Sequence, residues 1–301
     1  MTLRNERSQR KNNYRILAQR FVLEEQWEKA VMAYEKALSF SSGEDALDLL
    51  FDLANVYWTM GRMRDAVFCY KKILNKKPVP GAYYALGVLA FSDEDYKKAI
   101  KFLRKAVYYD PAYEEAYYYL ALTYDALGRK KVALELFFQC IHLNPYNAVV
   151  YSDIGSLYEE WGQYQRARRY VKRALSLDEG LYLSWYNLGV IEQKSGHLAR
   201  AEGAYARARA LMPNYPPVYL NLSSIYLPLG LYEKSAFILS QGIRLGAKSV
   251  NLYYNRACSY MRMGFRQEAI GDLSQAIVLE PEAREWASRD SDLKSIVKEV
   301  P

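Results

Sequence analysis

Small residues recur along the chain at steps of about 34 positions, and apolar residues recur around them in the same phase. From the first marker the steps are 36, 33 and then 34 five times, at Ala30, Ala66, Ala99, Ala133, Ala167, Ala201, Ser235 and Ala269. An aromatic residue lies sixteen positions before seven of these markers, and a second small residue lies twelve positions before all eight. Eight copies of one supersecondary unit are therefore expected to tile the chain from residue 11 to residue 283.

Within each unit, the hydrophobic pattern predicts two helices joined by a short turn. In the unit around Ala201, the i, i+3, i+4 spacing of one helix face is met at Trp185, Leu188 and Gly189, and Tyr205 continues the stripe of a second helix. Six units carry a glycine between the two stripes, at the place where a helix end adopts the left-handed conformation: Gly61, Gly128, Gly162, Gly196, Gly230 and Gly264. No unit can bury its apolar faces alone, so neighbouring units must stack.

This pattern resembles the tetratricopeptide repeat family, and the resemblance covers about nine-tenths of the chain. It implies an all-α fold, a right-handed superhelical solenoid of antiparallel helix pairs, with repeats at 11–44, 47–80, 80–113, 114–147, 148–181, 182–215, 216–249 and 250–283. Residues 1–10 are expected to form a basic N-terminal tail. Residues 284–301 are expected to form a C-terminal capping helix, with Asp290 or Ser291 as its N-cap and with Leu293, Ile296, Val297 and Val300 on its apolar side.

The net charge of +7 is concentrated at the start of the chain. Residues 1–20 hold six basic residues and one acidic residue, a balance of +5, which leaves +2 for all the rest. The three cysteines lack the spacing of a zinc site, and no apolar run is long enough to span a membrane or to form a secretory signal. We therefore expect a cytoplasmic protein without a structural metal.

The sequence offers no recognisable catalytic chemistry. The two histidines, His142 and His197, have no acid or nucleophile at a familiar spacing, and the motifs of nucleotide-binding proteins, metalloproteases and serine hydrolases are absent. We therefore expect a protein that is not an enzyme, with no catalytic residue, no metal ligand and no cofactor.

Three charged residues interrupt the core pattern. Arg256 stands where the other units have leucine or isoleucine, and Asp272 lies on the facing helix of the same unit. An unpaired charge at such a position would cost roughly 3–5 kcal/mol, so a buried or half-buried Arg256–Asp272 ion pair is predicted. Glu192 stands where most other units have tyrosine or phenylalanine, and it is expected to reach water or a nearby arginine such as Arg200.

The resemblance also implies a partner-binding surface, because in this family the first helix of each repeat lines a concave groove. Its lead position and the turns beyond it carry apolar residues, at Phe51, Trp58, Tyr84, Val88, Phe91, Tyr118, Leu122, Tyr186 and Tyr254. The neighbouring position is polar in the second half of the chain, at Asp153, Asn187, Asn221 and Asn255. This row resembles the asparagine ladder of O-linked N-acetylglucosamine transferase, whose side chains can hold a peptide backbone. Packing between repeats is the alternative role for these residues, and the sequence leaves both open.

The expected function is that of a non-enzymatic protein–protein interaction scaffold, which binds a peptide or helical segment of another protein in the concave groove. Two alternatives stay open. One is a nucleic-acid-associated protein that uses the basic tail and a basic convex face, although Asp125, Asp153 and Glu159 place acid in the groove and disfavour nucleic acid there. The other is a regulatory subunit of an enzyme complex.

Overall fold

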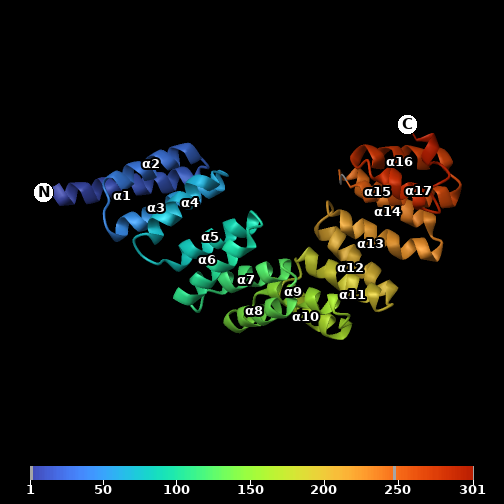
Figure 1. Ribbon diagram of the computed structural model, residues 1–301, viewed down its shortest axis with the longest axis horizontal. Helices are drawn as coiled ribbons and strands as arrows, with labels where there is room; N and C mark the ends of the chain where they lie inside the picture. Colours follow the sequence, from blue (N-terminus) through green and yellow to red (C-terminus); the bar gives the residue numbers. More distant parts are fainter. Residues whose placement is uncertain (1–2, 247–248, 301) are drawn as a thin grey trace. The chain divides into compact units, whose positions relative to one another are not determined.

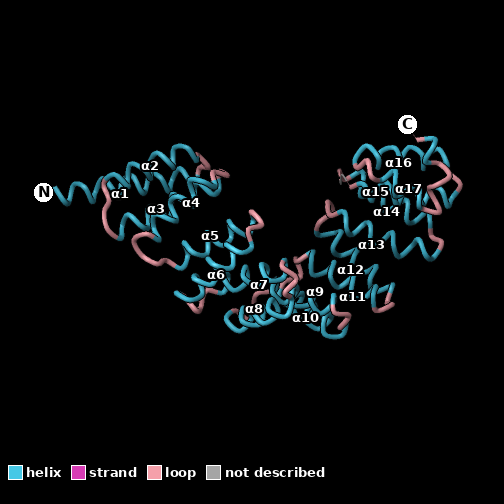
Figure 2. The backbone as a smooth tube through the Cα atoms, viewed as in Figure 1, coloured by secondary structure: helices cyan, strands magenta, loops and turns pink. Residues whose placement is uncertain are grey.

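The computed structural model describes residues 3–246 and 249–300, and all regular structure in these residues is helical (Figures 1 and 2). The chain divides into two compact units, Met1–Pro145 and Tyr146–Pro301, which are described separately below. The helices of the first unit are α1 (Leu3–Leu23), α2 (Trp27–Ser39), α3 (Glu44–Thr59), α4 (Met63–Leu74), α5 (Pro80–Ser92), α6 (Tyr96–Tyr109), α7 (Glu114–Ala126) and α8 (Lys130–Leu143).

The second unit continues the same alternation of helix and short loop (Figure 2). Its α-helices are α9 (Ala148–Glu160), α10 (Tyr164–Leu177), α11 (Tyr182–Lys194), α12 (Leu198–Leu211), α13 (Pro216–Tyr226), α14 (Tyr232–Arg244), α15 (Val250–Met263), α16 (Arg266–Leu279) and α17 (Ala283–Arg289). Two short 3₁₀ helices, η1 (Leu227–Leu229) and η2 (Val297–Glu299), complete it. Pro228 lies in η1, just after α13, because proline cannot donate the hydrogen bond that would continue an α-helix.

Within each unit, every odd-numbered helix from α1 to α15 packs on the helix that follows it, and the even-numbered helix then packs on the next pair. The predicted all-α architecture of stacked helix pairs is thus confirmed in both units. Small residues make the close crossings possible. A Cβ atom added at Gly189 on α11 would lie 2.5 Å from the ring of Tyr205 on α12, so only glycine fits there.

The turns inside the pairs adopt the left-handed conformation that the glycines predict. The six glycines in these turns have φ between 69° and 82°. In the two pairs that lack the glycine, Glu25 and Glu94 occupy the same place, with φ of 55° and 58°. A side chain makes this conformation costly, by roughly 1–2 kcal/mol, so these two turns are strained by comparison with the others.

The start of the chain differs from the expected tail. In the described part of residues 1–10, the chain from Leu3 onward already belongs to α1. This stretch has neither proline nor glycine and is rich in Arg, with one Gln and one Glu, all of which are good helix formers. The basic segment is therefore an extension of the first helix, and the side chains of residues 5–10 are exposed.

A C-terminal helix is present, but it begins earlier and is shorter than the apolar stripe predicts. The α-helix in this region, α17, ends at Arg289, and residues 291–296 form turns before η2. The side chain of Asp290 accepts a hydrogen bond from the backbone N–H of Asp292 at 2.8 Å, which favours a turn over a helix N-terminus. The apolar residues of this segment are nevertheless buried, and Leu293, Ile296 and Val300 pack against Ala257, Ala269 and Leu273.

A membrane-crossing helix would need to be both long and strongly apolar. None of the helices in residues 3–246 and 249–300 meets both conditions. The longest helix, α1, has 21 residues and carries a row of basic side chains.

Candidate partner-binding surface

The predicted groove residues all lie on odd-numbered helices, and they fall into two chemically different groups. In the first unit they are Phe51 and Trp58 on α3, Tyr84, Val88 and Phe91 on α5, and Tyr118 and Leu122 on α7. In the second unit they are Asp153 on α9, Tyr186 and Asn187 on α11, Asn221 on α13, and Tyr254 and Asn255 on α15. All of them are half-buried except Val88, which is buried and so contributes to the core instead of to an accessible surface.

The half-buried aromatic residues of α5 and α7 form one connected cluster. Tyr84 packs against Tyr113 and Tyr119, with ring centroids 5.0 and 5.7 Å apart, and Phe91 meets Tyr119 edge-on at 5.8 Å. Tyr118 lies 5.8 Å from Tyr119 in the same arrangement. Edge-to-face contacts of this kind are energetically favourable, and they hold the four rings in a fixed arrangement. We call the accessible part of this surface the aromatic strip, comprising Phe51, Trp58, Tyr84, Phe91, Tyr118 and Leu122.

The N-terminal end of the aromatic strip opens into a cavity of about 290 Å³ that Phe51 lines together with Arg15, Asp52, Val79 and others. Arg15 Nη2 lies 3.2 Å from Asp52 Oδ2. Burial raises the pKa of the Asp52 carboxyl, and the charge of Arg15 only partly offsets this. A Cβ atom at Gly81 would lie 3.2 Å from the Phe51 ring, so glycine keeps the wall of the cavity free of a side chain.

The asparagines of the second unit are engaged between repeats. Asn187 Nδ2 donates to Ser152 Oγ at 3.2 Å, and Asn221 Nδ2 donates to the hydroxyl of Tyr186 at 3.1 Å. Each bond spans 35 residues, one more than the 34-residue repeat. It therefore joins a residue of one repeat to the preceding repeat, at the place one position earlier in the unit. Opposite Asn255 the lead position is Leu220, which offers no acceptor. At Asn187 and Asn221, therefore, the ladder residues also fasten adjacent repeats.

In the first unit, neighbouring repeats meet at the same pair of positions, which we call the junction, but the contacts there are aromatic and ionic. Tyr119 meets Tyr84 across 35 residues through an aromatic contact, and Asp52 meets Arg15 across 37 residues through the ion pair. The longer spacing at the first junction matches the longer step from Ala30 to Ala66. Tyr119 was not among the predicted site residues, and this spacing of a repeat plus one position is the sequence signal that would have identified it.

A polar network extends the junction at Asn221. Its side-chain N–H group also donates to Tyr205 OH at 3.1 Å, and Tyr205 OH in turn donates to Gln193 Oε1 at 2.8 Å. Gln193 Nε2 donates to Ser224 Oγ at 2.9 Å. Gln193, Tyr205 and Ser224 come from three different helices, and their register gave no sequence signal for this network. A satisfied network of this kind holds α11, α12 and α13 in one arrangement.

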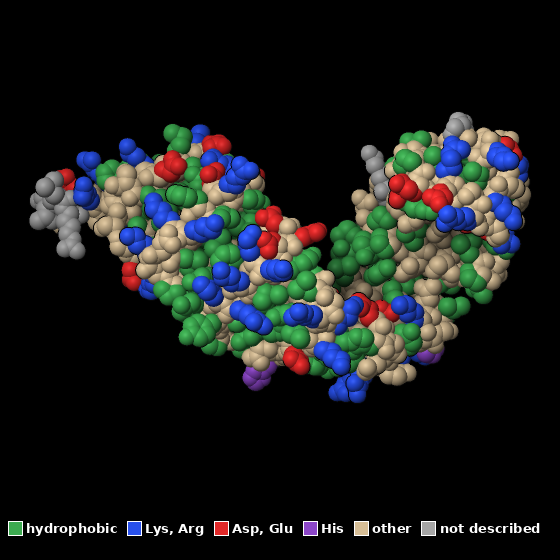
Figure 3. Space-filling view, viewed as in Figure 1, with side chains coloured by type: hydrophobic (Ala, Val, Ile, Leu, Met, Phe, Trp, Pro, Cys, Tyr) green, Lys and Arg blue, Asp and Glu red, His purple; other side chains and the backbone are tan. Residues whose placement is uncertain are grey.

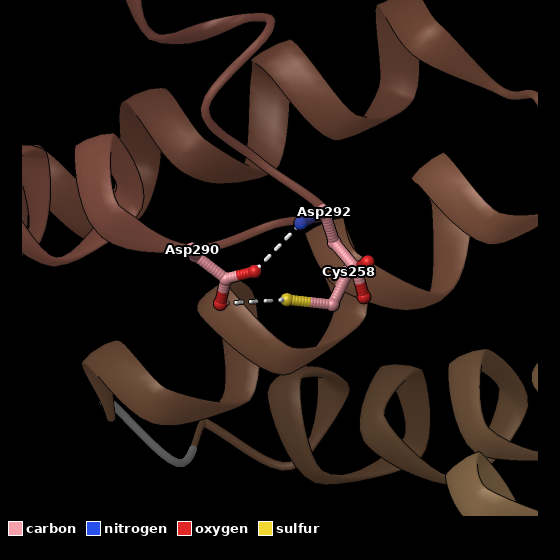
Figure 4. A group of neighbouring side chains, drawn as sticks. All are labelled: Cys258, Asp290 and Asp292. Carbon is pink, nitrogen blue, oxygen red and sulfur yellow. Dashed lines mark hydrogen bonds between the residues drawn. The ribbon is translucent and has the colours of Figure 1, made fainter.

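Tyr254 is covered by the C-terminal segment of the same unit (Figure 4 shows the neighbouring Cys258 and the two aspartates). Its hydroxyl donates to Asp290 Oδ2 at 3.1 Å, and its ring meets that of Trp286 edge-on. Asp292 Oδ1 pairs with Arg262 Nη2 at 2.7 Å. The C-terminal segment thus contacts three side chains spaced one turn apart on α15, those of Tyr254, Cys258 and Arg262. Because of these contacts, Tyr254 does not belong to an open surface.

Cys258, Asp290 and Asp292 place a sulfur and two carboxylates within 4.8 Å of one another, a spacing that a metal ion can bridge. Each of the three is already engaged: the Cys258 thiol donates to Asp290 Oδ2 at 4.0 Å, and Asp292 pairs with Arg262. Burial, with the nearby aspartates, raises the pKa of the Cys258 thiol to about 12, whereas metal binding requires the thiolate. The arrangement therefore fits an anchor for the C-terminal segment better than a metal centre.

The residues that interrupt the core pattern lie in two ion pairs, in each of which the carboxylate is buried and the guanidinium is half-buried. Arg256 Nε lies 2.7 Å from Asp272 Oδ2 and its Nη2 lies 2.6 Å from Oδ1, the bidentate geometry expected of a strong pair. Glu192 is paired with Arg168, not with Arg200, at 2.7 and 3.0 Å. Burial raises the pKa of Glu192, but the hydrogen bonds and charge of Arg168, helped by His197, bring it below its ordinary value.

Basic side chains are numerous on the even-numbered helices. On the face of the first unit visible in Figure 3, Lys and Arg side chains are interspersed with hydrophobic ones. Two of the basic residues on α6 lie against aromatic rings: Arg104 donates to Tyr124 OH at 2.6 Å, and Lys105 lies 5.2 Å from the ring centroid of Tyr83. On α10, Arg168 is committed to Glu192. Part of this basic surface is therefore engaged with the protein's own side chains.

Models of known protein families match the repeats of this chain. Two family models, both described as "Tetratricopeptide repeat", match residues 51–114 and 153–238 and residues 114–147, which together make up more than half of the chain. Among curated proteins, the chain is 28% identical over 121 residues to the general transcriptional corepressor ssn6 of Schizosaccharomyces pombe. That match covers 39% of this chain and 11% of the corepressor, so the chain spans about a tenth of its length.

Solved structures show the same fold. The Pseudomonas aeruginosa protein pilF superposes with a TM-score of 0.60 at 21% identity, over 70% of this chain and 97% of that one. The structure of the APC/C hetero-tetramer Cut9–Hcn1 gives a TM-score of 0.63 at 17% identity, over 91% of this chain and 52% of that one. At this level of identity the similarity concerns the fold alone.

Proposed function

The chain belongs to the tetratricopeptide repeat family, and we propose that it is a non-enzymatic scaffold that binds a segment of another protein along the aromatic strip of its first unit. The fold itself supports a role in protein–protein interaction. The observation that carries the finer proposal is the row of half-buried aromatic side chains on α3, α5 and α7. Accessible apolar rows of this length are typical of partner sites, and rigid aromatic residues dominate the energy of such interfaces.

The chemistry of the strip favours a partner segment with apolar anchors. Phe51, Trp58 and Leu122 offer apolar contact, and the Arg15–Asp52 pair at one end can orient a polar or charged residue of the partner. In the second unit, the amide N–H groups of Asn187 and Asn221 are engaged between repeats, which leaves their carbonyl oxygens to accept from a peptide backbone. We therefore assign the main binding energy to the first unit and a secondary, sequence-tolerant contribution to the second.

The two alternatives differ in their support. A regulatory subunit of a larger complex would use the same surface, and it differs from a scaffold only in the identity of its partner. A nucleic acid would bind the basic side chains of the even-numbered helices, but Arg168 on α10 is neutralised by Glu192, and Asp93, Glu94 and Asp95 lie in the turn just before α6. This observation favours the protein partner.

The test is a quantitative pull-down from cell lysate with three forms of the full chain. The strip variant carries Trp58→Ala and Leu122→Ala, and a matched control carries Phe68→Ala and Tyr108→Ala, two exposed aromatic residues on the even-numbered helices. Circular dichroism verifies that all three forms fold. Protein partners that are lost with the strip variant and kept by the control support the proposal. Partners that all three forms retain equally would refute a role for the strip.

A further inference from the structure

The first helix pair carries apolar residues that the equivalent positions of later pairs bury. Leu17 on α1 is 38% exposed, whereas its counterparts Leu53 on α3 and Leu86 on α5 are each 3% exposed. The difference has a simple cause. A preceding helix, α2 or α4, covers α3 or α5, while no helix in the described part of the chain lies on the corresponding side of α1. Leu17 is therefore an apolar residue of the kind that packs between helices, at a position that no described helix of this unit covers.

The exposed residues around Leu17 form one surface across α1 and α2. A cavity of about 290 Å³ is lined by Tyr14, Leu17, Phe21, Lys29, Met32, Ala33 and Lys36. Met32 is 69% exposed, and Tyr14 and Phe21, on the same side of α1 as Leu17, are half-buried. We call this the end face. Isolated apolar residues on a surface need no explanation, but a contiguous apolar groove marks a binding site.

Charge restricts what can cover the end face. Of the residues that line the groove, Lys29 and Lys36 are charged, and both are basic. They lie about two helical turns apart, at i and i+7 on α2, so they are on the same side of the helix and flank the groove along its length. A second copy of the chain, related by a two-fold axis, would bring like charges together there. A segment with acidic residues beside its apolar face would instead find opposite charges.

From these observations we infer that the end face binds an amphipathic helix of another protein, whose apolar stripe covers Leu17 and Met32 and whose flanking acidic residues face Lys29 and Lys36. The occupant is helical because the equivalent faces of α3 and α5 are covered by helices in this same unit. The end face is distinct from the aromatic strip, so this inference stands or falls independently of the proposed function.

The probe is a fluorescein-labelled peptide of residues 25–42 of this chain, the segment that contains α2 and covers α3 in the structure. In the acidic peptide, Lys29→Gln and Lys36→Gln are introduced on the side away from α3, so that Glu28 and Glu35, which face Arg62 and Tyr57 in the structure, supply the charge on the docking side. In the basic control peptide, Glu28→Lys and Glu35→Lys are introduced instead. Binding to the full-length chain is measured by fluorescence anisotropy. Two facing charge pairs should make the acidic peptide bind about tenfold more tightly than the basic one at low salt, and less so at high salt.

Protein variants locate the site. Met32→Gln, at an exposed position that leaves the core intact, and Leu17→Gln should together weaken binding of the acidic peptide by about tenfold or more. Val278→Gln on α16, at a position 74% exposed, is the matched control and should leave binding unchanged. No binding of the acidic peptide, equal binding of both peptides, or insensitivity to the Leu17 and Met32 changes would each overturn the inference. So would a chain dimer in sedimentation that the Met32→Gln variant abolishes, because the end face would then bind a second copy.

Discussion

The two units place different chemistry at the same junction between repeats. In the first unit, Tyr119 meets Tyr84 through an edge-on aromatic contact, and in the second, Asn221 meets Tyr186 through a hydrogen bond, each across 35 residues. The backbone arrangement is shared, so the position demands a contact with the preceding repeat but not one kind of contact. The first unit thus keeps an accessible apolar strip, while the second is fastened by directed polar bonds.

The comparison changes how an asparagine ladder is interpreted. From sequence, Asn187 and Asn221 resemble peptide-binding residues, but both use their side-chain N–H groups within the protein. Their spacing in the sequence follows from the repeat period, and a structural junction has the same period as a binding row. Periodicity alone therefore cannot separate the two roles, and mutations that measure stability and binding together are needed.

The largest effect is expected at the buried charges of the second unit. Asp272→Ala leaves the half-buried Arg256 without its partner and should lower the free energy of unfolding by about 3 kcal/mol, measured by urea denaturation of the full chain. The double variant Arg256→Leu with Asp272→Ala reproduces the residues Leu188 and Ala204 of an earlier repeat. It should recover most of the loss. A single variant as stable as the wild type would show that water solvates Arg256 and that the pair is not buried in solution.

A smaller loss is expected at the aromatic junction of the first unit. Tyr119→Ala removes the ring that contacts Tyr84, Phe91 and Tyr118, and it should cost about 2–3 kcal/mol because the ring is only half-buried. Tyr119→Leu keeps apolar volume and should cost clearly less. Hydrogen exchange would localise the loss to α5 and α7. If Tyr119→Ala loosened α13 or α15 as well, the assignment of this contact to the first unit alone would be wrong.

The loss of stability should be smaller still at the polar junction of the second unit, and a different control substitution applies there. Asn221→Ala removes the donor shared by the hydroxyls of Tyr186 and Tyr205, with an expected cost of about 1–2 kcal/mol. Asn221→Leu keeps a similar volume but can neither donate nor accept, so it should not restore stability. Recovery with leucine would mean that shape, not hydrogen bonding, fastens this junction.

Much of the fold could be predicted because one period governs it. Ala30 and its successors set the repeat, and Gly61 and its counterparts set the turns, so the helix pairs follow from local rules. The C-terminal segment lies outside the period, and the hydrogen bond from the Asp292 N–H to Asp290 turned the chain where an apolar stripe predicted a helix. Partners of Glu192 were missed for another reason. Arg168 and Arg200 are both basic residues near Glu192, and only the packing of α10 on α11 selects Arg168.

The smallest effect is expected at the turns inside the helix pairs, which differ between the two units. All four turns of the second unit have glycine in the left-handed position, whereas the first unit uses Glu25 and Glu94 in two of its four. Glycine adopts this conformation without the clash of a Cβ atom, so Glu94→Gly should raise the free energy of unfolding by about 1 kcal/mol or slightly less, because glycine also gains freedom in the unfolded chain. Glu94→Ala separates the two contributions of the change. It removes the carboxylate but keeps the Cβ atom, and it should bring no gain. Equal stabilisation by alanine and glycine would attribute the effect to the charge of Glu94 beside Asp93 and Asp95, and not to the backbone.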